Sequence, residues 1–384
     1  MKRPFAALFV VAVVVAPSWG GAEPAAAREP VGVFSPFDGS GPIFARLAPG
    51  SLRPGRPRLD LGEYHQDWSF SPDGSQLALG MGGQGNPCGR GICIVDVATM
   101  RIAGYVHASV AVEAIAWLRP RRIVGLVMGG EVILADPVTE TVIRSSDLPF
   151  RRPSWPPVAR TSEGLAVLMR RPRPPHLVVV NAHGDVRIVA LRRIGRRPGL
   201  AAARRGGRAF VVAAGGLVAE VNLRTMGVRY HRVPSLRATG SSEAVWLGRG
   251  LLAAVNDRGG VQVIDTRTWN ARTVSLRATR ARLAAGRLLL WSDGDFGRRR
   301  GGVGLSVYSR DGRRLVRHLF GKRELVVEVA GEHAYALRPG APSARAVHVV
   351  RARTGELVGT VAPPPRGYEV QILSSPLGSN RMPR

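Results

Sequence analysis

The sequence contains very little lysine, cysteine or aromatic residue. Of its 55 basic residues only Lys2 and Lys322 are lysine, so the positive charge is carried by arginine. Two cysteines exclude a disulfide-rich scaffold and a four-cysteine zinc site. Aromatic residues are 6% of the chain, too few to alternate with the arginines in a groove on which nucleic-acid bases stack. With only 27 acidic residues, the chain has a formal net charge of +28.

Long apolar runs are also missing after the first sixteen residues. Two basic residues at 2–3 precede an apolar run at 5–16, and three alanines follow at 25–27. This order is typical of a secretory signal peptide, whereas a membrane span needs about 20 apolar residues. We therefore predict that residues 1–27 are a signal peptide and that residues 28–384 form a secreted or extracytoplasmic protein without a transmembrane span.

Export gives the cysteine pair a simple interpretation. Cys88 and Cys93 lie in a short glycine-rich segment, and in an oxidising compartment we predict that they form a disulfide. Their spacing does not match a C-x-x-C redox pair. The closed loop is short, so the expected stabilisation is modest.

The body of the chain repeats. The 47 glycines and 29 prolines favour short strands joined by turns. An apolar strand ending in a polar residue, with Thr or Gly three residues later, recurs at spacings of 40 to 45 residues. The polar residues are Asp96, Asp136, Asn181, Asn222, Asp265, Ser309 and Arg351. A second marker, a glycine before an apolar strand, recurs at 164, 207 and 250. Such a period, with four short strands in each unit, is the signature of a β-propeller.

Both ends of the repeat region also have strand patterns. Seven tandem units occupy about 65–362, while segment 31–62 contains three expected strands and segment 366–374 contains one. We predict an all-β fold, a single propeller domain over 28–384, in which the two end segments together make an eighth, composite blade. Closure of this kind protects exposed strand edges. The alternative is a seven-bladed ring with both ends packed as extra strands.

One hairpin carries a family resemblance. Residues 70–78 read Phe-Ser-Pro-Asp-Gly-Ser-Gln-Leu-Ala, which resembles the "FSPDG" hairpin of WD40-like propellers, including the TolB-type repeat. Proline presets such a turn and glycine accepts its last position. The full motif occurs once, and the resemblance implies an exported propeller repeat protein.

Linear motifs for chemistry are missing. The sequence has no G-x-S-x-G, no H-E-x-x-H and no phosphate-binding loop. Asp293 and Asp295 lack the rest of a calcium loop and are followed by three arginines. We predict no catalytic residue, no cofactor and no metal site, and a non-enzymatic protein. The alternative is a propeller enzyme, such as a lactonase, a lyase or a quinoprotein-like oxidoreductase, whose site several blades assemble at the central channel.

The arginines suggest where a partner binds. In a four-stranded blade, the loop between the second and third strands lies on the same face as the linker to the next blade. Many arginines fall in these segments. The candidate partner-binding residues are Arg151, Arg152, Arg170, Arg171, Arg173, Arg192, Arg193, Arg196, Arg197, Arg258, Arg298, Arg299 and Arg300.

We interpret this face as a positive field that attracts an anionic partner. The partner is an unknown protein or an anionic component of the cell envelope, and export argues against nucleic acid. The alternative is that the arginines are general surface charge of an arginine-rich chain. The sequence thus predicts a monomeric, exported scaffold that binds a protein or ligand.

Overall fold

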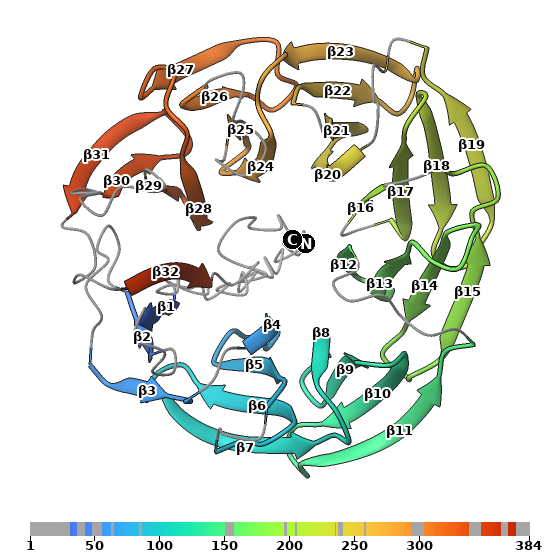
Figure 1. Cartoon of the computed structure of the whole chain (residues 1–384), viewed down its shortest axis with the longest axis vertical. Coiled ribbons are helices and arrows are strands. Elements are labelled where there is room, and N and C mark those ends of the chain that lie inside the picture. Colours follow the sequence, from blue (N-terminus) through green and yellow to red (C-terminus); the bar gives the residue numbers. More distant parts are fainter. Residues whose placement is uncertain are drawn as a thin grey trace, which may run out of the picture.

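The structure is a computed structural model. It describes residues 31–36, 43–47, 56–62, 65–83, 87–149, 157–195, 198–203, 206–234, 236, 241–256, 259–292, 303–337, 347–361 and 368–373. These residues form eight four-stranded antiparallel sheets, arranged as blades around a ring (Figure 1). The predicted all-β propeller with eight blades is therefore confirmed. Among the described residues, no helix has the length and apolar character needed to cross a membrane.

Seven blades follow one another along the chain, each running from the inner strand to the outer strand (Figure 1). Blade 1 consists of β4 (His65–Phe70), β5 (Gln76–Met81), β6 (Gly91–Asp96) and β7 (Arg101–His107), and blade 2 consists of β8 (Val112–Arg119), β9 (Arg122–Val127), β10 (Glu131–Asp136) and β11 (Thr141–Asp147). Blade 3 consists of β12 (Val158–Thr161), β13 (Gly164–Met169), β14 (His176–Val180) and β15 (Val186–Ala190), and blade 4 consists of β16 (Gly199–Ala203), β17 (Arg208–Ala213), β18 (Leu217–Asn222) and β19 (Val228–Arg232). Blade 5 consists of β20 (Ser241–Gly248), β21 (Leu251–Asn256), β22 (Val261–Asp265) and β23 (Asn270–Ser275), and blade 6 consists of β24 (Arg280–Ala284), β25 (Arg287–Trp291), β26 (Leu305–Ser309) and β27 (Leu315–Leu319). Blade 7 consists of β28 (Val326–Ala330), β29 (His333–Leu337), β30 (Val347–Arg351) and β31 (Glu356–Val361).

Blade 8 is built from both ends of the described chain. Its order is β32 (Tyr368–Leu373), β1 (Val31–Pro36), β2 (Ile43–Arg46) and β3 (Arg58–Asp60), with β32 innermost (Figure 1). Val31 pairs with Leu373 and Pro36 with Tyr368, so β1 and β32 match along their full length. The C-terminal strand thus supplies the inner strand that the N-terminal trio lacks, as the sequence predicts.

The repeated polar residues occupy the turns between third and fourth strands. In blade 1 the amide of Thr99 donates to Asp96 Oδ1 at 2.7 Å, and in blade 3 the amide of His183 donates to Asn181 Oδ1 at 2.8 Å. A short polar side chain that bonds its own downstream backbone stabilises such a turn. The period of the sequence is therefore the period of this turn.

The repeated glycine has a steric cause in blade 3. Gly164 has a φ of +140°, and a Cβ atom there would lie 2.0 Å from the carbonyl oxygen of Val180. Only glycine tolerates both this dihedral angle and this close approach. In blade 3 the glycine marker thus reflects the tight contact between the second and third strands, while Gly207 and Gly250 share its positive φ, at +57° and +78°.

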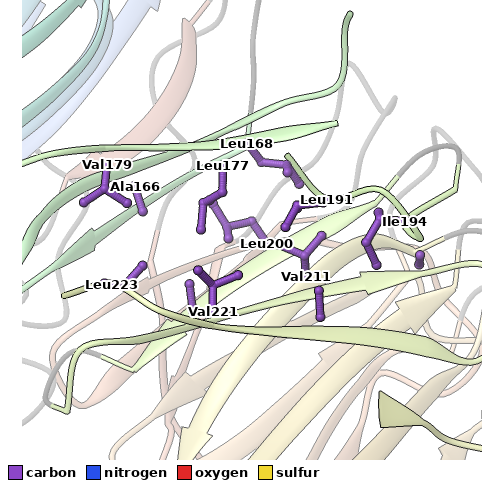
Figure 2. Close-up of a cluster of buried hydrophobic side chains, with 13 residues drawn as sticks. Ala166, Leu168, Leu177, Val179, Leu191, Ile194, Leu200, Val211, Val221 and Leu223 are labelled. Atoms are coloured by element: carbon purple, nitrogen blue, oxygen red, sulfur yellow. The ribbon is translucent and has the colours of Figure 1, made fainter. Parts of the chain in front are cut away.

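Hydrophobic clusters lie between neighbouring blades. All six residues of β13 are buried, because both faces of a middle strand are covered by adjacent sheets. Between blades 3 and 4, Leu168 and Leu177 pack with Val211 and Val221, and Figure 2 shows this cluster with Ile194 at one side. Ile194 comes from the linker between the two blades, so the linker is anchored in the core.

Candidate functional site

The loops of blade 3 line an open cavity of about 860 Å³. One wall comes from the loop between β13 and β14, and the other from the linker that follows β15. The described lining residues are Arg170, Arg171, Arg173, Pro174, Pro175, Arg192, Ile194, Gly195 and Pro198. A cavity of about 300–1,000 Å³ has the size that proteins use for small ligands.

Backbone contacts hold the two walls together. The amide of Leu191 donates to the carbonyl of Pro175 at 2.7 Å, and the amide of Ile194 donates to that of Leu191 at 2.9 Å. Arg170 Nη2 donates to the carbonyl oxygen of Pro198 at 3.2 Å across the cavity. Because Ile194 is also buried in the core between blades 3 and 4, the cavity rests on a packed support.

The other arginines of the cavity carry uncompensated charge. Arg171, Arg173 and Arg192 are exposed, and within the described part of the chain none of them forms a hydrogen bond or an ion pair. No carboxylate is among the described lining residues. Like charges held together at one site repel one another and attract an anion. The described lining of the cavity therefore carries a net positive charge.

The structure brings together part of the predicted set. Arg170, Arg171, Arg173 and Arg192 line this cavity. Arg193 does not: its guanidinium carbon lies 5.4 Å from the ring centroid of Tyr230 on β19 of the next blade. The remaining predicted residues lie outside the described residues, namely Arg151, Arg152, Arg196, Arg197, Arg258, Arg298, Arg299 and Arg300.

Several arginines toward the opposite face join blades. Arg144 Nη1 on β11 donates to Asp185 Oδ1 in blade 3 at 2.8 Å. Arg187 Nη1 on β15 donates to the carbonyl of Arg224 in blade 4 at 2.6 Å. Both contacts run from an outer strand to the turn between the third and fourth strands of the next blade. These guanidinium groups form hydrogen bonds between blades, whereas the exposed guanidinium groups at the cavity do not form any with described residues.

Charged residues also connect three inner strands on one side of the ring. Asp67 Oδ2 on β4 accepts from the amide of Ile115 on β8 at 2.8 Å and from Arg160 Nη2 on β12 at 2.7 Å. Arg160 also donates through Nε to the carbonyl of Ile115 at 2.8 Å, and through Nη2 to that of Trp68 at 2.6 Å. Sequence reasoning missed this network because its members are up to 93 residues apart.

A second group of charges lies on the inner strands of blades 5 to 7. Glu243 on β20 forms an ion pair with Arg282 on β24, and Glu328 on β28 interacts electrostatically with the same arginine. Burial raises the pKa of Glu328 to about 7, and the nearby Arg282 opposes the rise. The sequence signal was a single acid within an otherwise apolar strand, Val326–Ala330. Across the described ranges, no three His, Cys, Asp or Glu side chains are grouped to hold a metal ion.

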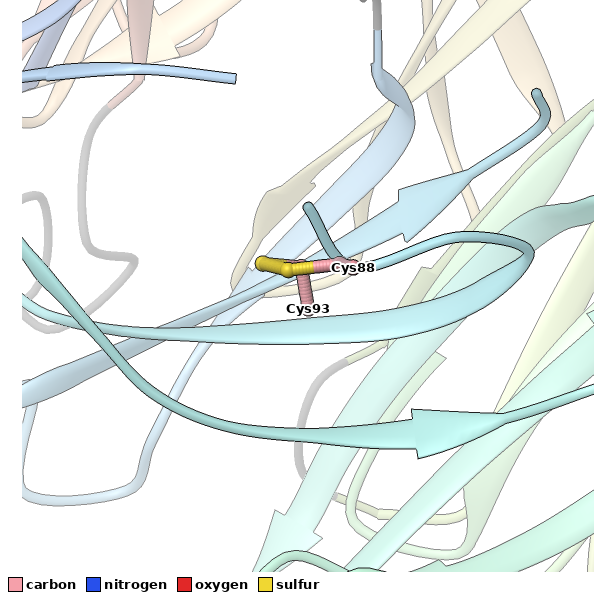
Figure 3. The surroundings of a disulfide bond; sticks show 2 residues. All are labelled: Cys88 and Cys93. Atoms are coloured by element: carbon pink, nitrogen blue, oxygen red, sulfur yellow. A yellow bond between two sulfur atoms is a disulfide. The ribbon is translucent and has the colours of Figure 1, made fainter. Parts of the chain in front are cut away.

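The two cysteines lie in blade 1 (Figure 3). Cys88 and Cys93 are joined by a disulfide with sulfur atoms 2.07 Å apart, as the sequence predicts. Both residues are buried and pack in the hydrophobic cluster of Leu79 and Met81. The disulfide thus fastens the loop between β5 and β6 to the core of its own blade.

Comparisons with known proteins identify the fold and no family. No protein-family model and no curated protein sequence matches the chain. Among solved structures, the chain is similar to NirN, a dihydro-heme d1 dehydrogenase in complex with DHE, with a TM-score of 0.61, 14% identity, and coverage of 89% of this chain and 74% of NirN.

Two further structures have the same kind of fold. Apo AztD from Citrobacter koseri has a TM-score of 0.54 and 11% identity, over 90% of this chain and 98% of AztD. BamB from Moraxella catarrhalis has a TM-score of 0.51 and 11% identity, over 79% of this chain and 92% of BamB. Identities at this level show the propeller fold alone.

Proposed function

We propose that the protein is an exported, non-enzymatic β-propeller that binds an anionic partner through the loop face of blade 3. The observation that carries this proposal is the cavity with Arg171, Arg173 and Arg192 exposed and without counter-ions among the described residues. Holding these charges close together has an electrostatic cost that an anionic partner relieves. The partner is a protein or another anionic component of the cell envelope.

Export is part of the same proposal. The disulfide between Cys88 and Cys93 is of a kind that persists in oxidising compartments, which supports an extracytoplasmic location. The predicted signal peptide, residues 1–27, lies outside the described residues. The hairpin at 70–78 contains a tight turn, in which the amide of Gly74 donates to the carbonyl of Ser71 at 2.7 Å. This turn supports a relation to TolB-type repeats.

The test compares two triple variants with the native chain. One variant replaces the exposed arginines of the cavity: Arg171→Gln, Arg173→Gln and Arg192→Gln. The control removes the same charge from exposed positions in turns between third and fourth strands: Arg313→Gln, Arg314→Gln and Arg353→Gln. Each purified protein is immobilised and incubated with solubilised cell envelope from its own organism, at low and high salt, and the retained material is quantified.

We expect native protein and the control to retain the same envelope component at low salt and to lose it at high salt, because salt screens exposed charges. The cavity variant should retain little at either salt concentration. Retention that is equally strong in all three proteins, or retention that does not depend on salt, contradicts the proposed function. The absence of any retained component contradicts it as well.

A second candidate function is a propeller enzyme, favoured by the charged group on the inner strands. A partly buried carboxyl with a pKa near 7, as Glu328 has, is suited to general acid–base chemistry. NirN shows that this fold carries a dehydrogenase in another protein, although fold does not determine function. A screen of hydrolase, lyase and oxidoreductase substrates against the native chain and Glu328→Gln tests this candidate, which requires turnover that the substitution abolishes.

A further inference from the structure

We propose that the cavity of blade 3 binds a phosphoryl group, as a phosphate ester or a free phosphate. This inference rests on the proposed function and names the chemistry of the anion. It follows from the number of guanidinium groups, their arrangement on two loops, and the apolar surface between them.

The number of positive charges favours a phosphoryl group over a single carboxylate. Four arginines line the cavity, and none of the other described lining residues is charged. A carboxylate offers one negative charge and two acceptor oxygens, so it neutralises less of this set than a phosphoryl group does. A phosphoryl group carries about −1.5 to −2 charge at pH 7 and three acceptor oxygens. It can therefore accept from guanidinium groups on both loops at once.

The residue type points the same way. Arginine presents a planar fork of donors that matches the oxygens of a phosphate, whereas lysine acts as a point charge. The donors come from opposite walls: Arg171 and Arg173 from the loop after β13, and Arg192 from the linker after β15. Arg170 already bridges the two walls through Pro198, so the walls are held in place before a ligand arrives.

The cavity has room for more than the phosphoryl group. Pro174, Pro175, Ile194 and Pro198 contribute apolar surface to its walls. At about 860 Å³, the cavity also accepts the organic part of an ester. A ligand with a phosphoryl end and a compact apolar body would therefore use both kinds of surface.

The test measures binding of defined probes to the folded full chain by isothermal titration calorimetry. The soluble probes are inorganic phosphate, pyrophosphate, phenyl phosphate and glutarate. Glutarate is a dicarboxylate that is close in charge to phenyl phosphate but has no phosphoryl group. Co-sedimentation with vesicles of phosphatidylcholine, with and without phosphatidic acid, provides the lipid arm. The variants are Arg171→Gln, Arg192→Gln and, as the matched control, Arg353→Gln. Circular dichroism verifies that every variant is folded.

We expect a phosphoryl probe to bind at one site. Arg171→Gln and Arg192→Gln should each weaken it about tenfold, as for loss of a charge-assisted hydrogen bond. Arg353→Gln should leave the affinity unchanged, and glutarate should bind at least about tenfold more weakly than phenyl phosphate. Binding of the soluble probes assigns the group to free phosphates or small esters. Binding of the phosphatidic acid vesicles alone, with the same dependence on Arg171 and Arg192, assigns it to a lipid headgroup.

The inference is overturned if no phosphoryl probe binds, if glutarate binds as tightly as the phosphates, or if Arg353→Gln weakens binding as much as the cavity variants. These outcomes would not contradict the proposed function, which the envelope experiment tests separately. A retained envelope component that depends on the cavity arginines, together with no phosphoryl binding, would mean that the cavity recognises a different anion.

Discussion

Replacing Arg160 with methionine should loosen the joint between blades 1, 2 and 3. The side chain donates from β12 to Asp67, Trp68 and Ile115, at 2.6–2.8 Å. Methionine keeps much of the apolar length of the side chain but none of these hydrogen bonds. The exposed fractions of the Arg160 and Asp67 side chains are 34% and 14%, so water partly replaces what is lost. At about 1 kcal/mol for each hydrogen bond, the free energy of unfolding should fall by about 3 kcal/mol.

Urea unfolding followed by circular dichroism measures this change. The denaturation midpoint of Arg160→Met should fall while the slope stays the same, because the surface exposed on unfolding is unchanged. Arg353→Met, at an exposed turn, should change the free energy by less than about 0.5 kcal/mol. In a double-mutant cycle with Asp67→Asn, we expect a coupling energy of about 1–2 kcal/mol. A change below about 0.5 kcal/mol for Arg160→Met, or strictly additive effects, would refute the assigned role.

Three further predictions concern single positions. Cys88→Ser opens a loop with a sequence separation of five and should lower the free energy of unfolding by about 2 kcal/mol; reduction of the native protein should have the same effect in urea titrations. Because the folded-state pKa of Glu328 is about 7 and lies above its ordinary value of 4.5, the folded state binds its proton more tightly, so stability should fall as pH rises from about 4.5 to 7. Glu328→Gln should remove this pH dependence and stabilise the protein at pH 8 by about 2 kcal/mol, a value reduced for partial exposure. Urea titrations in which the native protein has the same free energy of unfolding at pH 5 and at pH 8 would contradict this. Gly164→Ala should lower the free energy of unfolding by about 3 kcal/mol or more, because the added Cβ atom clashes with a neighbouring carbonyl. Gly359→Ala has open space at its Cβ position, so its urea midpoint should be nearly that of the native protein.

The architecture could be predicted because it depends on local signals that repeat. Asp96 and Asn181 each accept from their own downstream backbone in the turns of different blades, and Gly164, Gly207 and Gly250 all have a positive φ before a second strand. Each signal needs only a few consecutive residues, so the period and the blade count follow from the sequence. The composite blade could be predicted because segment 31–62 has the patterns of three strands and lacks an inner one, while segment 366–374 has the pattern of a single strand.

The site was only partly predictable because it depends on which loops face one another. Arg170 and Arg192 were identified as members of one face, but nothing in the sequence indicated that they share a cavity while Arg193 turns toward Tyr230. The charges of the inner strands were missed altogether. Asp67 meets Arg160 because three blades converge at the axis, and such convergence leaves no trace in a linear motif.

The pairing of β1 with β32 has a consequence for how the protein is made. Val31 on β1 pairs with Leu373 on β32. Blade 8, which contains the first described strand, can therefore form completely only after β32 has been synthesised. Blades 1 to 7 each contain only consecutive strands and can assemble in order during synthesis. The ring itself closes only after the chain has been synthesised as far as β32. A chain that is truncated before residue 368 would keep the edge of β1 unpaired, and it would present that edge to proteases and to other unfinished chains. Ring closure therefore requires both β1 and β32 to be present in the same molecule.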